Sequence, residues 1–285
     1  MSEALLQVQN LVVRFSGHRG LQTTVINGVS FDLHAGETLS LVGESGSGKT
    51  TIGRAILGLA PVSSGEITFR GETISNVPRN RRRKLARNVQ VIFQDPYSSL
   101  NPSMTVEDII VEPMAAAGVS GGRDKVKGLL DSVGLPADAG QRYPREFSGG
   151  QRQRIAIARA LALEPSVIVC DEPTSALDVT TQARVLTLLE DIQQATGVAY
   201  LFISHDLGVV RHVSDRIAVL YQGRIVELGE AEQVTMEPRH DYTRRLQMAA
   251  PVADPIKQRD RRQARMKYLA EHPALELGTP TASTV

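Results

Sequence analysis

Short apolar runs alternate with longer amphipathic stretches along most of the chain. The runs have the length of strands and are rich in aliphatic side chains, as expected of strands that are buried on both faces. They lie at 38–42, 89–93, 167–171, 198–203 and 216–221. A helical pattern at 180–195 separates two of them. Strands that alternate with helices in this way predict an α/β fold around a largely parallel sheet.

Two regions depart from this alternation. Residues 5–42 alternate apolar and polar positions, with turns expected at 17–20 and 35–36, which predicts antiparallel strands beside the first core strand. Residues from about 95 to 163 contain helical patterns separated by Gly and Pro, which predict an inserted helical subdomain. These helices are expected at 105–117, 123–133 and 151–163.

Composition narrows the class of protein. With 285 residues, of which 41% are hydrophobic, the chain can bury one large α/β core with an inserted subdomain. No apolar run approaches the ~18 residues needed to cross a bilayer, and a signal-peptide pattern is missing, so we expect membrane association only through a partner. The single cysteine, Cys170, excludes a disulfide framework and a cysteine-rich iron–sulfur or zinc site.

Charge gives no reason to expect nucleic acid as a partner. The formal net charge is +1, which implies no overall attraction to a polyanion. The densest basic cluster lies at 79–87, without aromatic side chains, and a second basic stretch covers 257–267. We interpret both as solvated faces rather than nucleic-acid patches.

The strand at 38–42 is followed by a glycine-rich octapeptide that matches the P-loop pattern and opens a helical stretch. Glycines let backbone N–H groups turn toward phosphate oxygens, and the helix N-terminus adds its positive dipole end. Lys49 is expected at the β- and γ-phosphates, and the Thr50 hydroxyl at Mg²⁺. The predicted nucleotide-binding residues are Gly43, Glu44, Ser45, Gly46, Ser47, Gly48, Lys49, Thr50 and Thr51. The motif predicts that the chain binds ATP with Mg²⁺.

Two carboxylates end the apolar run at 167–171. Asp171 would hold Mg²⁺ through water, and Glu172 would polarise the attacking water. An ordinary core strand can also end in this way, so this pair alone does not identify an enzyme.

A second anion site is indicated before the helical stretch at 152–163. The residues Ser148, Gly149, Gly150 and Gln151 place a serine and two glycines at a helix N-terminus. Taken alone, these residues are better explained by an ordinary N-cap.

Together these motifs resemble those of the nucleotide-binding subunit of an ABC transporter. The P-loop, Gln94, the signature Ser148 to Gln151 with Phe147 in place of the usual Leu, the Asp171–Glu172 strand, Asp178 and His205 occur in the order of that family. The resemblance covers about residues 5 to 255. It implies an α/β P-loop NTPase (RecA-like) core with an antiparallel β subdomain, an inserted helical subdomain and a short C-terminal extension.

The resemblance also implies roles for single residues. Gln94 and His205, each after a core strand, are expected to act in catalysis with Glu172: Gln94 at Mg²⁺ or the water, and His205 at the γ-phosphate. Phe15 would stack on adenine, although a core position explains it as well. Asp178 would lie at a dimer seam, although a cap on the helix after it explains this residue as well.

Within the family, the chain resembles the ATPases of the dipeptide, oligopeptide and nickel import group. The segments that carry this resemblance are 43–50, 94–102, 143–147 and 238–246 with Pro251, with Asp241 where Pro is usual. We therefore expect an ABC ATPase domain at 1–235, with its helical subdomain at about 95–163, and a C-terminal extension and flexible tail at 236–285.

The expected function is that of an ATP-hydrolysing motor subunit of an importer. The predicted substrates are di- or oligopeptides, with nickel or glutathione as alternatives. A non-transport ABC ATPase in DNA repair or translation, and a non-hydrolysing nucleotide sensor, are the rivals from other classes. The resemblance implies two transmembrane permease subunits, a second related ATPase subunit in a heterodimer, an extracytoplasmic substrate-binding protein, and a peripheral position on the cytoplasmic face of the membrane.

Overall fold

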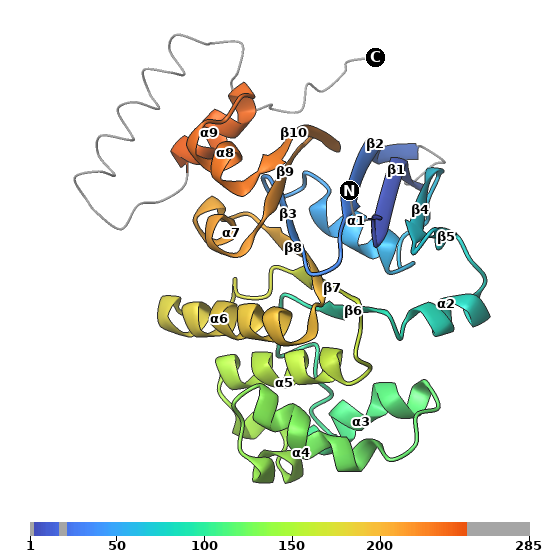
Figure 1. Ribbon diagram of the computed structural model, residues 1–285, viewed down its shortest axis with the longest axis vertical. Coiled ribbons are helices and arrows are strands. Elements are labelled where there is room, and N and C mark those ends of the chain that lie inside the picture. The colour runs from blue at the N-terminus through green and yellow to red at the C-terminus, as the bar shows by residue number, and fades with distance from the viewer. Residues whose placement is uncertain (1–2, 17–21, 250–285) are drawn as a thin grey trace.

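The computed structural model describes residues 3–16 and 22–249 (Figure 1). The expected turn at 17–20, the basic stretch at 257–267 and the tail after Pro251 lie outside the described residues.

A six-stranded sheet forms the centre of the molecule, in the order β10-β9-β3-β8-β7-β6. All pairs are parallel except that of β10 with β9. Its strands are β3 (Thr38–Val42), β6 (Val89–Ile92), β7 (Val167–Asp171), β8 (Ala199–Ser204), β9 (Arg216–Tyr221) and β10 (Arg224–Glu230). The predicted core strands agree with these bounds to within one residue at each end.

Both faces of this sheet are covered, which explains why its strands are apolar throughout. In β8, Leu201 and Ile203 belong to one hydrophobic core, and Tyr200 and Phe202 belong to another on the opposite face. Successive side chains of a strand point to opposite faces, so every residue of such a strand must be compatible with burial. The carboxyl ends of the parallel strands are thereby held in a fixed row.

A separate four-stranded antiparallel sheet lies beside the core, in the order β2-β1-β4-β5. Its strands are β1 (Leu6–Ser16), β2 (Gln22–Leu33), β4 (Ser64–Phe69) and β5 (Glu72–Thr73). The alternation at 5–42 predicted the first two strands and the turn at Ala35 and Gly36. These strands do not extend the core sheet; β2 pairs with β1, and β1 pairs with the later strand β4.

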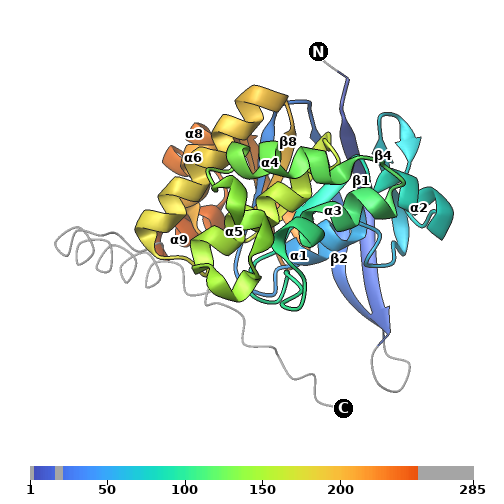
Figure 2. The ribbon, with the colours of Figure 1, turned by 90° about the horizontal axis from the view of Figure 1, so that it is seen from below.

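Some of the helices pack against the core sheet, and others form a layer of their own (Figures 1 and 2). They are α1 (Lys49–Ile56), α2 (Arg79–Leu85), α3 (Val106–Ala116), α4 (Gly122–Ser132), α5 (Gly149–Leu161), α6 (Val179–Thr196), α7 (Leu207–Val213), α8 (Ala231–Met236) and α9 (Asp241–Ala249), with short 3₁₀ turns η2 (Ala137–Gln141) and η3 (Pro144–Glu146). Figure 1 shows α3, α4 and α5 at the end of the molecule far from the antiparallel sheet, where the helical insertion was expected. Across residues 3–16 and 22–249, each helix is too short or too polar to span a membrane.

The basic cluster at 79–87 is only partly a solvated face. Arg82 donates hydrogen bonds to the carbonyls of Ile56 (2.9 Å) and Ile74 (2.5 Å), and Arg83 and Arg87 donate to carbonyls at the end of α3. The last carbonyls of a helix lack partners within the helix, and the several N–H groups of a guanidinium can satisfy them. These arginines therefore attach α2 to its neighbours.

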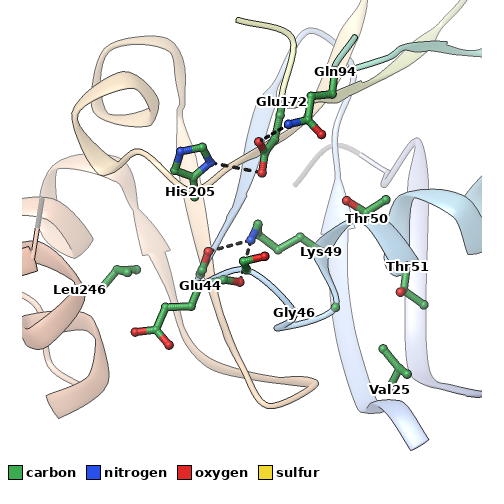
Figure 3. Close-up of a pocket in the computed structure, with 13 residues that line it drawn as sticks. Val25, Glu44, Gly46, Lys49, Thr50, Thr51, Gln94, Glu172, His205 and Leu246 are labelled. Atoms are coloured by element: carbon green, nitrogen blue, oxygen red, sulfur yellow. Dashed lines mark hydrogen bonds and ion pairs between the residues drawn. The ribbon is translucent and has the colours of Figure 1, made fainter. Parts of the chain in front are cut away.

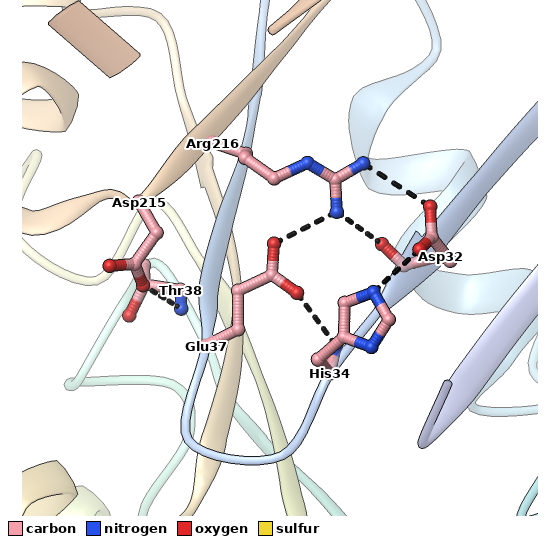
Figure 4. Close-up of polar contacts among 6 residues, drawn as sticks. All are labelled: Asp32, His34, Glu37, Thr38, Asp215 and Arg216. Atoms are coloured by element: carbon pink, nitrogen blue, oxygen red, sulfur yellow. Dashed lines mark hydrogen bonds and ion pairs between the residues drawn. The ribbon is translucent and has the colours of Figure 1, made fainter. Parts of the chain in front are cut away.

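A cluster of charged side chains lies at the end of the core sheet where β3 and β9 begin (Figure 4). Arg216, at the start of β9, donates to Glu37 at 3.0 Å and to Asp32 of β2 at 3.2 Å. His34 Nε2 lies 2.7 Å from Asp32. Burial alone would raise the pKa of Asp32, but Arg216 and then His34 outweigh it and hold that pKa below its usual value. The cluster joins the antiparallel sheet to the core at the end of β3 that lies away from the P-loop.

Candidate functional site

The P-loop connects the end of β3 to the start of α1 and has a backbone that only glycine accommodates. Gly46 and Gly48 have φ angles of 80° and 109°. A Cβ atom on Gly43 would lie 2.2 Å from the Leu220 carbonyl oxygen, and one on Gly48 would lie 2.5 Å from Ile26 Cδ1. The loop therefore brings the backbone N–H groups at the start of α1 together without side chains in the way, as an anion site requires.

Lys49 lies over this loop (Figure 3). Its side chain is buried, and Nζ donates to the carbonyls of Gly43 at 2.7 Å and Glu44 at 2.9 Å. Burial lowers the pKa of Lys49, and the carboxylates of Glu172, Asp171 and Glu44 oppose that shift. A phosphate group in the loop would give this ammonium the oxygen acceptors and the negative charge that a buried cation needs.

Oxygen ligands for a divalent cation meet beside Lys49. The Thr50 hydroxyl donates to Asp171 at 2.9 Å. Burial raises the pKa of Asp171, and the hydrogen bond from Thr50 opposes this shift. Within the described ranges, no three His, Cys, Asp or Glu residues could hold a metal by themselves. This set suits Mg²⁺, which keeps several waters and binds through one or two protein oxygens together with substrate phosphates.

Glu172 contacts two side chains that follow the strands on either side of its own. Its carboxylate accepts a hydrogen bond from Gln94 Nε2 at 3.1 Å, and its other oxygen lies 3.2 Å from His205 Nδ1 (Figure 3). Its backbone has a φ of 48°, unusual for a residue other than glycine, and its N–H is held by the Ile203 carbonyl at 2.9 Å. Strained backbone of this kind occurs at functional sites. The three side chains follow β6, β7 and β8, so the parallel sheet places them together.

One pocket of about 670 Å³ contains most of the predicted site. Its predicted lining residues are Gly43, Glu44, Ser45, Gly46, Gly48, Lys49, Thr50, Thr51, Gln94, Glu172 and His205. The prediction missed two apolar lining residues, Val25 of β2 and Leu246 of α9, which lie on opposite sides of the pocket in Figure 3. Val25 belongs to no recognisable motif, and Leu246 ends the C-terminal segment 238–246 that carries the family resemblance, for which no role at the P-loop was predicted. Only the folded chain brings the two residues to the P-loop.

The remaining predicted site residues do not line this pocket. Phe15 lies near the end of β1 and is 41% exposed, which excludes the core position but does not test adenine stacking. Ser148 and Gln151 form a reciprocal capping box at the start of α5, with hydrogen bonds of 3.4 and 3.0 Å. Asp178 caps α6 by accepting from the Thr181 N–H at 3.0 Å. The structural alternatives for Ser148 and Asp178 are thus realised, and their nucleotide-binding roles stay predictions.

Gly150 has a packing reason to be glycine. A Cβ atom at this position would lie 2.3 Å from Thr181 Cγ2, at the start of α6. The N-terminal ends of α5 and α6, both of them capped, are therefore in contact. The signature segment and Asp178 thus form one continuous edge of the molecule's surface.

Comparison with known proteins agrees with this site. Residues 26–175, more than half of the chain, match the family model described as ABC transporter. The chain belongs to the ABC transporter family. It is 52% identical over 269 residues to the glutathione import ATP-binding protein GsiA of Shigella dysenteriae serotype 1 (strain Sd197), and 51% identical to that of Escherichia coli (strain K12). Each alignment covers 91% of this chain and 43% of the relative. The chain thus spans less than half the length of these relatives.

Solved structures agree on the fold of an ATP-binding cassette. The cassette MJ0796, in a dimeric post-hydrolysis state bound to ADP and phosphate, is 27% identical with a TM-score of 0.71 over 79% of this chain and 98% of that one. The protein cbiO1 from Clostridium perfringens, part of the transporter complex cbiONQ, is 25% identical with a TM-score of 0.73 over 95% of this chain and 100% of that one. The predicted fold class, a P-loop core with an antiparallel β subdomain and a helical subdomain, is confirmed.

Proposed function

We propose that this chain is the ATP-hydrolysing subunit of an ABC importer for glutathione or a closely related short peptide. The observation that carries the ATPase part is the convergence of Lys49, Thr50, Glu172, Gln94 and His205 in one pocket. The sequence-based reading favoured di- or oligopeptides and kept glutathione as an alternative. The names of the relatives at 51–52% identity support that alternative more directly.

The chemistry follows from the positions of the side chains. The P-loop and Lys49 would bind the β- and γ-phosphates, while Thr50 and, through water, Asp171 would hold Mg²⁺, with Gln94 at the ion or at the attacking water. The ion supplies charge stabilisation at the phosphate oxygens. Glu172 orients the attacking water and accepts its proton. Gln94 and His205 keep the Glu172 carboxylate in position, and His205 can turn a donor toward the γ-phosphate.

A second ATPase subunit completes this site. Ser148, Gly149, Gly150, Gln151 and Asp178 lie outside the chain's own pocket. Such an edge fits the γ-phosphate side of a partner's nucleotide, where the helix N-terminus of α5 favours negative charge. The partner is a related but different ATPase, and both dock on two permease subunits served by an extracytoplasmic binding protein. The assembly places the chain on the cytoplasmic face of the membrane, with no nucleic acid as partner.

The test separates the ATPase from its cargo. The chain is co-purified with its transporter, reconstituted in vesicles, and assayed for ATP hydrolysis with reduced glutathione, a dipeptide or Ni²⁺ supplied with the binding protein. We expect glutathione to stimulate hydrolysis most, and Lys49→Ala to abolish it by removing nucleotide affinity. Stimulation by Ni²⁺ alone would contradict the proposed cargo. Hydrolysis that Lys49→Ala leaves unchanged would contradict the proposed ATP site. Two copies of this chain with no second ATPase would overturn the heterodimer.

A further inference from the structure

The C-terminal helix α9 reaches the P-loop directly. Tyr242 is 1% exposed, and its hydroxyl accepts a hydrogen bond from the backbone N–H of Glu44 at 3.0 Å. Burial raises the pKa of Tyr242, so the hydroxyl stays neutral. The Glu44 N–H is therefore directed at α9, and it serves to fix the loop.

Tyr242 is itself held in place by its surroundings. Its ring lies against that of Tyr221, with 4.2 Å between ring centroids. The nearly buried carboxylate of Glu227, in β10, accepts the N–H groups of Arg239 at 2.8 Å and His240 at 3.0 Å, just before α9 begins. Burial alone would raise the pKa of Glu227, but the hydrogen bonds to its carboxylate, these two N–H groups among them, outweigh burial and keep that pKa below its usual value. The segment that carries Tyr242 is thus anchored to the core sheet.

The P-loop has little other support on this side. A hollow of about 190 Å³ lies between the loop residues from Glu44 to Ser47 and the side chains of Tyr221, Gln222 and Tyr242. The Gly223 N–H donates to the Ser47 carbonyl at 3.1 Å. The Ser47 hydroxyl is buried and lacks a hydrogen-bond partner among the described residues. A loop that borders an open volume is not fixed by packing, so single hydrogen bonds contribute more to its conformation.

We propose that Tyr242 is a positioning residue of the nucleotide site, which holds the P-loop in its binding conformation through the Glu44 N–H. Leu246, one turn further along α9, lines the nucleotide pocket, so the same helix forms part of its wall. The inference rests on the proposed function, because it takes the pocket to bind ATP. With this role for Tyr242, the C-terminal extension is part of the ATP site, and the affinity for nucleotide depends on how α9 packs against the P-loop.

The test removes only the hydroxyl. Tyr242→Phe keeps the ring that packs against Tyr221 and deprives the Glu44 N–H of its acceptor. The matched control is Tyr200→Phe, in which another buried tyrosine loses a 3.0 Å hydrogen bond to a backbone carbonyl, that of Leu189, at the opposite end of β8 from His205. Both variants are made in the full chain. ATP affinity is measured by calorimetry, and hydrogen exchange of the P-loop amides is measured without nucleotide.

We expect Tyr242→Phe to weaken ATP binding by about 3- to 10-fold, because only the fraction of molecules with an ordered loop binds. The Glu44 amide should exchange faster in this variant, while Tyr200→Phe leaves both readouts at the wild-type value. Equal affinity and equal exchange in Tyr242→Phe and wild type would overturn the proposal, as would the same change in both variants. A wild-type chain that binds no ATP would instead contradict the proposed function, and the exchange measurement would still decide the role of Tyr242.

Discussion

At the scale of single residues, the position of the Glu172 carboxylate is determined more by neighbouring side chains than by its own strand. Gln94 and His205 hold its two carboxylate oxygens from adjacent strands, and its backbone takes a strained φ of 48°. Such an arrangement fixes the direction of the carboxylate, which general base catalysis requires.

We predict that Glu172→Gln retains ATP binding and lowers turnover by ~10²-fold or more, because the amide can still hydrogen-bond but cannot accept a proton. Binding by calorimetry and steady-state hydrolysis by the assembled transporter are the measurements. The control is Glu232→Gln, an exposed glutamate of α8, which should behave as wild type. Near-normal turnover in Glu172→Gln would remove this residue from the catalytic role.

At the scale of elements, α5 shows how one residue serves both local structure and the proposed composite site. Ser148 closes the capping box of α5 and also lies in the signature segment. A lost cap has a known cost in stability, whereas a lost phosphate ligand should appear only in the assembled ATPase pair.

Ser148→Ala should therefore lower the free energy of unfolding by about 1 kcal/mol and also reduce hydrolysis by the assembled pair. Thr105→Ala is the matched control, since Thr105 caps α3 by accepting from the Asp108 N–H at 3.2 Å and lies outside the nucleotide pocket. It should cost a similar free energy of unfolding, measured by urea denaturation, and leave hydrolysis unchanged. Equal hydrolysis by the two variants would reduce Ser148 to a helix cap.

At the scale of the whole molecule, the antiparallel sheet and the core sheet are separate sheets that share a hydrophobic core and are also joined by ion pairs (Figure 4). Arg216 bridges Asp32 of β2 and the nearly buried Glu37. Its removal deprives both carboxylates of their guanidinium partner and leaves Asp32 with His34 at 2.7 Å, and a partly buried charge that loses such a partner is costly.

We predict that Arg216→Gln lowers the free energy of unfolding by about 1–3 kcal/mol. Because the folded pKa of Asp32 is lowered, the stabilisation is complete above about pH 4 and is lost as the pH falls through that lowered pKa. Acid unfolding should show this dependence in wild type and lose part of it in the variant. Arg123→Gln, which removes an exposed guanidinium from its ion pairs with Glu107 and Asp108, should leave the free energy of unfolding unchanged. A similar loss in both variants would contradict the bridging role.

The sequence by itself determined the order of the core strands along the chain, the helical insertion and most of the nucleotide pocket. The reason is local: the short aliphatic runs at 38–42, 89–93, 167–171 and 198–203 predict strands buried on both faces, and parallel strands bring the residues that follow them to one edge. Lys49 and Glu172 were predictable because each follows such a strand directly or through the P-loop. Gln94 and His205 also follow strands, but their roles were predicted from the resemblance to ABC transporters.

The tertiary structure alone decided which distant segments meet. It paired β1 with β4 in a second sheet, attached the arginines of α2 to carbonyls of α1 and α3, and brought Val25, Tyr242 and Leu246 to the P-loop. None of these contacts has a sequence signal, because the partner of each strand or side chain lies far along the chain. Periodicity reports whether a position is buried, but only packing determines against what.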